Sequence, residues 1–107
     1  MPMFTIDRSA PTVEVEEIRL LTEDEQALLL PTSTMICESL EDNDSERWRL
    51  TQAGQFIRRT GVDGERVYVT DAVFAHEYLE GFCADDVMRE LAIAGAFDQI
   101  PAPAAPR

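Results

Sequence analysis

The sequence predicts a small α+β domain that is mainly helical, with about four short helices and a small β-sheet or hairpin. Three observations support this fold class. The 107 residues suit one domain, a hydrophobic content of 45% suits a globular protein, and several helix-start signals surround one clearly alternating segment. We expect a flexible N-terminal arm over residues 1–11, a single globular domain over 12–100, and a disordered Pro/Ala-rich tail over 101–107.

Residues 12–20 fit either a strand or a helix. Their apolar side chains alternate if a bulge falls at residues 16–17, and β-branched residues dominate, so we favour a strand. A helix is expected from Thr22, because Thr22 and Glu25 form a capping box in which each side chain binds a backbone N–H group. This helix should run through Leu30 and end before the proline that follows.

Two more helices are expected in the middle of the chain. The first restarts at Pro31 and ends near Glu41, and residues 41–46 follow it as an acidic loop. The second is capped by Thr51 and runs through Arg59. An Asp-Gly turn then leads into the next element.

Residues 65–70 alternate more regularly than any other segment, with two valines on one face and an arginine and a tyrosine on the other. They should therefore form a strand. Segments 71–80 and 84–94 are expected as helices, because each presents an apolar face and is followed by glycine. We expect these two helices to form the main hydrophobic hairpin.

Residues 48–57 contain the pattern x-L-T-x-x-G, formed by Leu50, Thr51 and Gly54. This segment resembles part of many winged-helix domains, in which a strand of the wing leads into a helix. The resemblance implies a DNA-binding domain with a basic recognition helix just upstream. The upstream residues are acidic instead and would repel phosphate groups, so the sequence argues against DNA binding.

Charge is sorted along the chain. Residues 1–46 carry a net charge of −10, residues 47–66 one of +3 and residues 67–107 one of −5, within a total of −12, and every basic side chain is arginine. This acidity argues against nucleic acids and membranes as direct partners. It indicates a protein partner with a basic or apolar surface, such as a DNA-binding regulator. The same acidity is also consistent with a role in solubility alone.

The sequence contains no motif that is typical of catalysis, of a metal site or of a cofactor, so we predict a protein that is not an enzyme and holds no cofactor. The rival hypothesis is a small enzyme or ligand-binding domain in which His76 activates the thiol of Cys83 or Cys37. The two cysteines have no close spacing, and no secretory signal is present, so we expect free thiols in the cytoplasm; the alternative is a disulfide between Cys37 and Cys83.

The expected partner-binding surface combines arginines, acids and aromatic side chains, because Arg and Trp are enriched at interface hot spots. The expected contact residues are Arg47, Trp48, Arg49, Glu41, Asp42, Asp44, Phe74, Tyr78 and Phe82. The arginines have a second interpretation, an internal clamp that neutralises the acidic loop. A homodimer is also consistent with the apolar surface of the last two helices.

These observations predict a small, acidic, non-catalytic regulatory or inhibitory protein that binds another protein. A concrete form is an anti-activator that masks the ligand-binding, dimerisation or DNA-binding region of a transcription regulator. The alternative is a phage-type inhibitor, an anti-defence protein that imitates the charge of nucleic acid. Salt separates the two forms, because a charge mimic should lose orders of magnitude in affinity between about 50 and 200 mM salt.

Overall fold

The computed structural model describes residues 2–41, 44–61, 65–98 and 100. Within these ranges the chain forms five strands, three α-helices and one short 3-10 helix. The strands are β1 (Ile18–Leu20), β2 (Thr34–Glu41), β3 (Asp44–Leu50), β4 (Phe56–Thr60) and β5 (Arg66–Thr70). The helices are α1 (Glu23–Leu29), the 3-10 helix η1 (Leu30–Thr32), α2 (Ala72–Glu80) and α3 (Asp85–Ile93).

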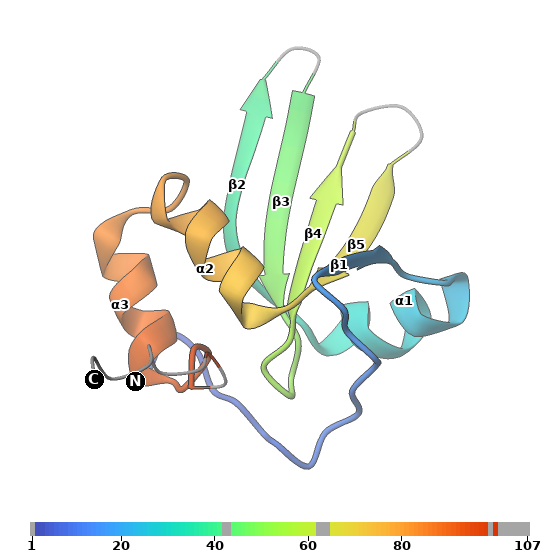
Figure 1. The fold of residues 1–107 in the computed structure, drawn as a ribbon, viewed down its shortest axis with the longest axis horizontal. Helices are drawn as coiled ribbons and strands as arrows, with labels where there is room; N and C mark the ends of the chain where they lie inside the picture. Colours follow the sequence, from blue (N-terminus) through green and yellow to red (C-terminus); the bar gives the residue numbers. More distant parts are fainter. Residues whose placement is uncertain (1, 42–43, 62–64, 99, 101–107) are drawn as a thin grey trace, which may run out of the picture.

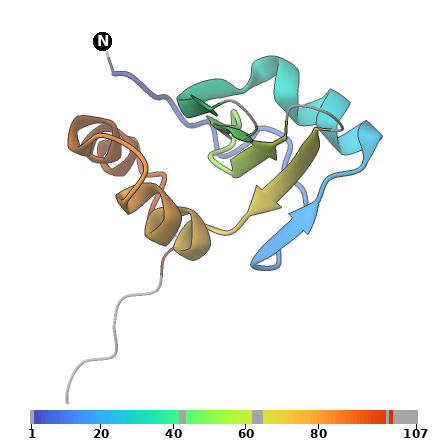
Figure 2. The same cartoon turned by 90° about the horizontal axis from the view of Figure 1, so that it is seen from above.

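The five strands form one antiparallel sheet in the order β1-β5-β4-β3-β2. Helix α1 packs on one face of the sheet, and the α2–α3 pair packs on the other (Figures 1 and 2). The prediction of a mainly helical domain with four helices is therefore wrong. In the described part of the chain, a five-stranded sheet is the central element and three α-helices cover its faces.

The two helices expected in the middle of the chain are strands. The one expected to end near Glu41 is β2, and the one expected from Thr51 to Arg59 is a turn followed by β4. The Thr51 hydroxyl accepts a hydrogen bond from the Gln55 N–H (2.9 Å), and the Thr51 N–H donates to the Gln55 carbonyl (2.8 Å). These bonds close a turn instead of starting a helix, so the winged-helix-like segment leads into a hairpin.

The helix start predicted at Thr22 is confirmed, and so is the start of the helix predicted over residues 71–80, whereas the starts predicted at Pro31 and Thr51 are wrong. At the start of α1, the Thr22 hydroxyl accepts from the Glu25 N–H (3.2 Å), and the Glu25 carboxylate accepts from the Thr22 N–H (3.0 Å). Asp71 caps α2 by accepting from the Phe74 N–H at 2.7 Å. Gly95 follows α3 with a φ of 89°, a left-handed conformation that favours glycine.

The two expected strands have different outcomes. Within residues 12–20 the strand is limited to β1, and Glu17 before it has a φ of 53° at the predicted bulge. Residues 65–70 contain β5, as predicted. The Asp-Gly turn at residues 62–64 lies outside the described residues, and so does the predicted tail over 101–107.

Acid is expected to weaken the start of α1. The pKa of Glu25 is lowered from 4.5 to about 2, mainly by the hydrogen bond from Arg19 and then by the one from the Thr22 N–H. A carboxylate with a lowered folded-state pKa stabilises the fold above its unfolded pKa and loses that contribution as the pH falls through its folded pKa. The melting temperatures of the wild type and Glu25→Gln should therefore differ near pH 7 and converge toward about pH 2. Glu23→Gln, which changes an exposed acid in the same turn, is the control, and its melting temperature should differ less from that of the wild type. If the melting temperatures of the wild type and Glu25→Gln differ by the same amount near pH 7 and near pH 2, the prediction is wrong.

Two hydrophobic clusters flank the sheet. The face toward α2 and α3, here the hairpin face, buries Trp48, Leu50, Phe56, Ala75, Leu79 and Leu91. The face toward α1, here the α1 face, buries Leu21, Leu29, Ile57, Val67 and Val69. Because successive strand residues alternate between faces, the neighbours Phe56 and Ile57 enter different clusters.

Residues of the expected flexible arm pack against the domain. Phe4 is 3% exposed and belongs to the hairpin-face cluster. Arg8 donates hydrogen bonds to the carbonyl oxygens of Ala53 (3.1 Å) and Gly95 (2.7 Å). The arm therefore contacts two segments that are distant in the sequence.

The two cysteines form a disulfide. Cys37 lies on β2, Cys83 lies between α2 and α3, and their Cα atoms are 6.3 Å apart. The expectation of free thiols is therefore wrong for this structure. Sequence spacing gave no signal for the pair, because Cys37 and Cys83 are 46 residues apart and are brought together by the packing of the helices on the edge strand β2.

Candidate functional site

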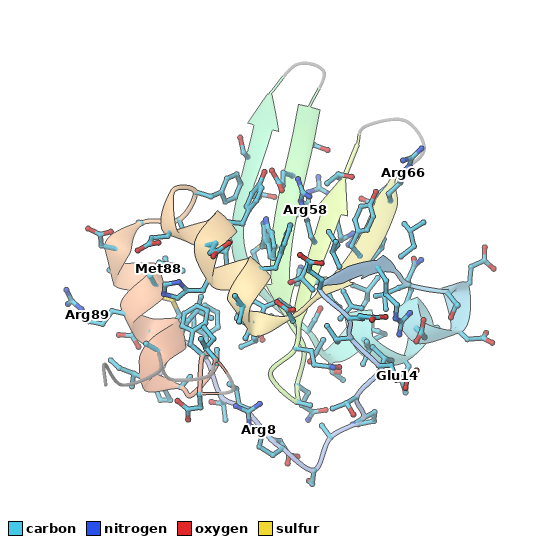
Figure 3. All side chains as sticks on the ribbon, viewed as in Figure 1. Arg8, Glu14, Arg58, Arg66, Met88 and Arg89 are labelled. Atoms are coloured by element: carbon cyan, nitrogen blue, oxygen red, sulfur yellow. A yellow bond between two sulfur atoms is a disulfide. The ribbon has the colours of Figure 1, made fainter. Side chains whose placement is uncertain are left out.

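Part of the hairpin face is not covered by helices. Strands β2 to β5 extend beyond α2 in Figure 1, and Figure 3 shows Arg58 of β4 in this part of the sheet. Leu20 lies opposite Tyr68 in the strand register, and Tyr68 lies opposite Arg58. Opposite residues of antiparallel strands point to the same face, so these side chains form a row. We define the open face as the side chains of Leu20, Glu46, Arg58, Tyr68, Phe74 and Tyr78.

Glu46 is the centre of a hydrogen-bond cluster within the open face. Its Oε2 accepts from the Tyr78 hydroxyl at 2.6 Å, and its Oε1 accepts from Arg58 Nε and, at 3.3 Å, from Trp48 Nε1. Arg58 Nη2 also donates to the Tyr78 hydroxyl at 3.2 Å, and its guanidinium carbon lies 4.6 Å from the centre of the Tyr78 ring. The Glu46 and Arg58 side chains are 16% and 22% exposed. Side chains from β3, β4 and α2 therefore hold one another in a fixed arrangement.

This cluster suits a positioning role better than acid–base catalysis. Burial is the main cause that raises the pKa of Tyr78, and the Glu46 carboxylate raises it further. Tyr78 therefore keeps its proton and continues to donate to Glu46. The carboxylate already accepts three hydrogen bonds, which leaves it poorly placed to take a proton from a substrate.

Aromatic side chains of α2 and the following turn border the open face. The ring centroids of Phe74 and Tyr78 are 6.3 Å apart, and those of Tyr78 and Phe82 are 6.0 Å apart. Tyr78 also packs on Trp48, with ring centroids 5.4 Å apart. Phe74, Tyr78 and Phe82 are half-buried, and Leu20 on the far side of the open face is 56% exposed. This border therefore presents aromatic and apolar surface to solvent.

The predicted contact residues separate into two groups in the fold. Phe74, Tyr78 and Phe82 lie together, as the previous distances show. Trp48 is 0% exposed, and its expected role in partner contact is corrected: it supports Tyr78 from within the core. Trp48 is in a strand, so its two arginine neighbours point to the opposite face.

Arg47 and Arg49 are engaged within the chain. Arg47 lies 3.4 Å from the Glu38 carboxylate and 4.0 Å from that of Glu65. Arg49 Nε donates to the Ser33 hydroxyl at 2.6 Å. Both arginines therefore have internal partners, but these partners lie outside the acidic loop that we expected them to neutralise.

The side chains of three further predicted contact residues are not described by the structure, and four residues of the open face were not predicted. The side chains of Glu41, Asp42 and Asp44 lie outside the described residues. The residues of the open face that our sequence reasoning missed are Leu20, Glu46, Arg58 and Tyr68. A period-two pattern in residues 44–50 would have placed Glu46 and Trp48 on one face, but we interpreted residues 41–46 as a loop and assigned no strand to residues 47–50.

The rival enzyme hypothesis loses its nucleophile in this structure. The Cys83 sulfur is bonded to Cys37, and the His76 ring packs edge-on against Phe97, with centroids 4.8 Å apart. Among the residues that the structure describes, no group of three or more His, Cys, Asp or Glu side chains is arranged to hold a metal ion.

The chain is acidic because its 21 acids outnumber its nine arginines, and several of these arginines are paired with acids within the chain. Ion pairs join Arg19 to Glu25, Arg47 to Glu38, Arg58 to Glu46 and Arg59 to Glu65. The exposed acids before β1 and in the first turns of α1 and α3 are Asp7, Glu14, Glu16, Glu17, Glu23, Asp24, Asp85 and Asp86. The chain therefore presents a negative potential to approaching molecules.

Comparisons of this chain with protein-family models, curated proteins and solved structures found no match. The helices in the described ranges are all too short or too polar to cross a membrane. The function proposed below therefore depends on the geometry and charge of the chain itself.

Proposed function

We propose that this chain is a small, acidic, non-catalytic regulatory protein that binds a protein partner through the open face. The observation that supports this most directly is the row that runs from the exposed Leu20 through Tyr68 to Arg58, at the border of the part of the sheet that α2 leaves uncovered. Tyrosine and arginine are enriched among the residues that dominate binding energy at interfaces. The exposed leucine beside them adds apolar area that a partner can bury.

The arrangement of Arg58 favours binding because its side chain is already ordered. Glu46 and Tyr78 hold the guanidinium group on one side. A partner that contacts Arg58 therefore loses little side-chain entropy. A guanidinium has five N–H donors in a planar fork, so those not used within the cluster are suited to a carbonyl or carboxylate of the partner.

The negative surface supports a partner with a basic surface. Complementary charge increases the rate of association and selects against partners of the same sign. Regulators that bind DNA carry such basic surfaces. The concrete form of the proposal is thus an anti-activator that masks a basic region of a transcription regulator.

Leu20→Glu is expected to weaken partner binding at least about tenfold, because a carboxylate in an apolar contact costs about 1.4 kcal/mol or more. Immobilised wild-type chain first captures the partner from a lysate of the source cells, and calorimetry with the purified partner then gives Kd for each variant. Leu28→Glu is the matched control, because Leu28 is 49% exposed and lies on α1, at the opposite face of the sheet. It should leave Kd nearly unchanged.

Equal weakening by both variants, or no effect of Leu20→Glu, would contradict the open face as the binding surface. A loss of orders of magnitude in affinity between about 50 and 200 mM salt would favour the charge-mimic alternative over apolar masking. Tight binding of the chain itself to duplex DNA would overturn the proposed function.

A further inference from the structure

The edge strand β2 presents a free edge to solvent. It lies at one end of the strand order, and within the described part of the chain it pairs with β3 alone. It spans Thr34–Glu41, and Figure 1 shows that its upper end extends beyond the helices. A strand in this position offers a row of backbone N–H and C=O groups to which a further strand can pair.

The hydrogen bonds of β3 show which backbone groups of β2 point outward. The Ser45 carbonyl accepts from the Gly61 N–H at 3.0 Å, so the backbone of Ser45 is directed toward β4 and away from β2. Leu40 lies opposite Ser45, so the N–H and C=O groups of Leu40 point to the outer edge. Because this pattern repeats at every second residue, those of Glu38 also point outward, whereas those of Ser39 bind β3.

This outer edge is regular and open to pairing. Among the residues that the structure describes, no backbone group binds the outward N–H and C=O groups of Glu38 and Leu40. From Cys37 to Glu41 each residue has one partner in β3. The irregularity between Met35 and Cys37 disturbs the start of the strand and leaves this stretch intact. Two N–H and two C=O groups are therefore available on a flat stretch of edge.

The other edge of the sheet is protected. Its strand β1 is short, Ile18–Leu20. The Leu21 N–H donates to the Val67 carbonyl, so the groups of the preceding residue, Leu20, point outward. Arg19 Nη1 donates to the Leu20 carbonyl at 3.2 Å and so occupies it. Short strands and charged side chains are common ways to prevent pairing at an edge, so β2 is the better edge for an added strand.

Acidic side chains lie on both faces of the sheet beside the β2 edge. The Glu38 side chain is 44% exposed although it pairs with Arg47. On the hairpin face, the disulfide of Cys37 holds the turn between α2 and α3 against β2. The exposed acids that flank this turn are Glu80, Asp85 and Asp86. Side chains of an added strand alternate between the two faces, so lysine and arginine would meet opposite charge on both. A second copy of this chain, with its own charge of −12, would meet like charge.

We propose that a basic extended segment of the partner protein adds to the outer edge of β2 as a further strand of the sheet. The backbone groups of Glu38 and Leu40 form the hydrogen bonds, and the acids on both faces select lysine and arginine side chains. Ser39 lies opposite Glu46, so the added strand runs along the border of the open face. The inference rests on the proposed function, since it takes the partner to be basic, and it adds how that partner is held.

The test uses the peptide acetyl-T-K-V-R-V-K-T-amide as the probe and the full, disulfide-bonded chain as the receptor. NMR follows hydrogen exchange of the backbone amides with and without an excess of peptide. In the free chain, the amides of Glu38 and Leu40 should exchange faster than that of Ser39, which binds β3. The peptide should slow exchange at Glu38 and Leu40 at least about tenfold and change that at Ser39 less. Unchanged exchange at Glu38 and Leu40 would overturn the proposal.

Two further peptides separate strand pairing from the general attraction of cations to an acidic protein. The first has glutamate in place of each lysine and arginine, and it should bind at least about tenfold more weakly. The second keeps the basic side chains but carries N-methyl groups on two adjacent central residues, which blocks both of its edges. It should give no protection at Glu38 and Leu40. Equal binding of the methylated and unmethylated peptides would show that charge alone attracts them, and the proposal would fail.

Two variants at one position separate the backbone of β2 from its charge. Glu38→Pro removes an outward N–H and no hydrogen bond to β3, so the fold should tolerate it on this edge strand. It should weaken peptide binding at least about tenfold, whereas Glu38→Gln, which keeps the N–H, should weaken it less. Equal Kd values for the two variants would contradict edge pairing. If Glu38→Pro does not fold, the exchange measurements on the wild type decide the question.

A second copy of the chain is the competing occupant of this edge. Sedimentation of the free chain measures its oligomeric state, and a monomer is expected. A dimer whose Glu38 and Leu40 amides are protected without peptide would assign the edge to self-association and overturn the proposal. Leu20→Glu changes the opposite end of the sheet and should leave peptide binding unchanged. Because peptide binding does not require Leu20, its failure would leave the open face as the proposed binding surface.

Discussion

Replacing Cys83 with alanine is expected to lower the free energy of unfolding by about 4 kcal/mol under oxidising conditions. The disulfide with Cys37 closes a loop with a sequence separation of 46 residues. A cross-link over a loop of this length removes much of the conformational entropy of the unfolded chain, which gives the stated magnitude. Urea denaturation of both proteins, followed by tryptophan fluorescence, measures the difference, because Trp48 is buried in the hairpin-face cluster.

The reduced wild type and the double variant Cys37→Ala/Cys83→Ala provide the control. If the disulfide is the cause, both should unfold near the midpoint of Cys83→Ala, and the oxidised wild type should unfold at a clearly higher urea concentration. Thiol titration of the unfolded, oxidised wild type should find no free thiol. Two free thiols, or a midpoint that a reductant does not change, would contradict the pairing.

The position of the disulfide connects stability to the open face. Cys83 follows Phe82, and its bond to Cys37 ties the end of α2 to the edge strand β2. The aromatic border of the open face is carried by this same helix and turn. Opening the bond should therefore loosen the position of Phe82 and Tyr78 relative to the sheet, in addition to its effect on the unfolded chain.

Elements with local chemical signals could be predicted from the sequence. Thr22 with Glu25 and Asp71 with Phe74 form caps from residues three positions apart, so their geometry does not depend on the rest of the fold. The alternation of residues 65–70 likewise identified β5. These elements were found because a few neighbouring residues specify them.

The middle of the chain could not be predicted in this way, because its structure depends on partners that are distant in sequence. Thr51 is an acceptable helix cap, yet its hydroxyl closes the β3–β4 turn. Pairing of Glu38 with Arg47 and of Arg58 with Tyr68 in the sheet is invisible to a local pattern. Tertiary pairing therefore overrode local preference in β2, β3 and β4.

The error in the candidate site has the same physical origin. Trp48 between two arginines suggested one exposed patch because we did not assign a strand there. In a strand, adjacent side chains alternate, so Trp48 enters the core while Arg47 and Arg49 lie on the other side of the sheet. The same alternation brings Glu46 beside Trp48 and builds the open face from residues that the charge pattern did not select.

Glu46→Ala is expected to lower the free energy of unfolding by about 2–3 kcal/mol. The substitution leaves Arg58 without its carboxylate and removes the acceptor of the Tyr78 hydroxyl. The magnitude lies between the values for exposed and fully buried ion pairs, because the two charged side chains are 16% and 22% exposed. Glu46→Gln keeps the size and an acceptor oxygen, so it should cost less; urea denaturation measures both.

A double-mutant cycle with Arg58→Met separates the ion pair from the other contacts of Glu46. If the two side chains hold each other as their geometry indicates, the coupling free energy should be about 1–2 kcal/mol, and the double variant should be more stable than the sum of the single effects implies. Ser39→Ala is a control, because Ser39 lies opposite Glu46 in the β2–β3 register. Its substitution should change stability little.

A coupling below about 0.5 kcal/mol would show that Glu46 and Arg58 behave as an ordinary surface pair. Arg58 would then be mobile, and the open face would lose the pre-ordered cation on which its proposed binding role depends.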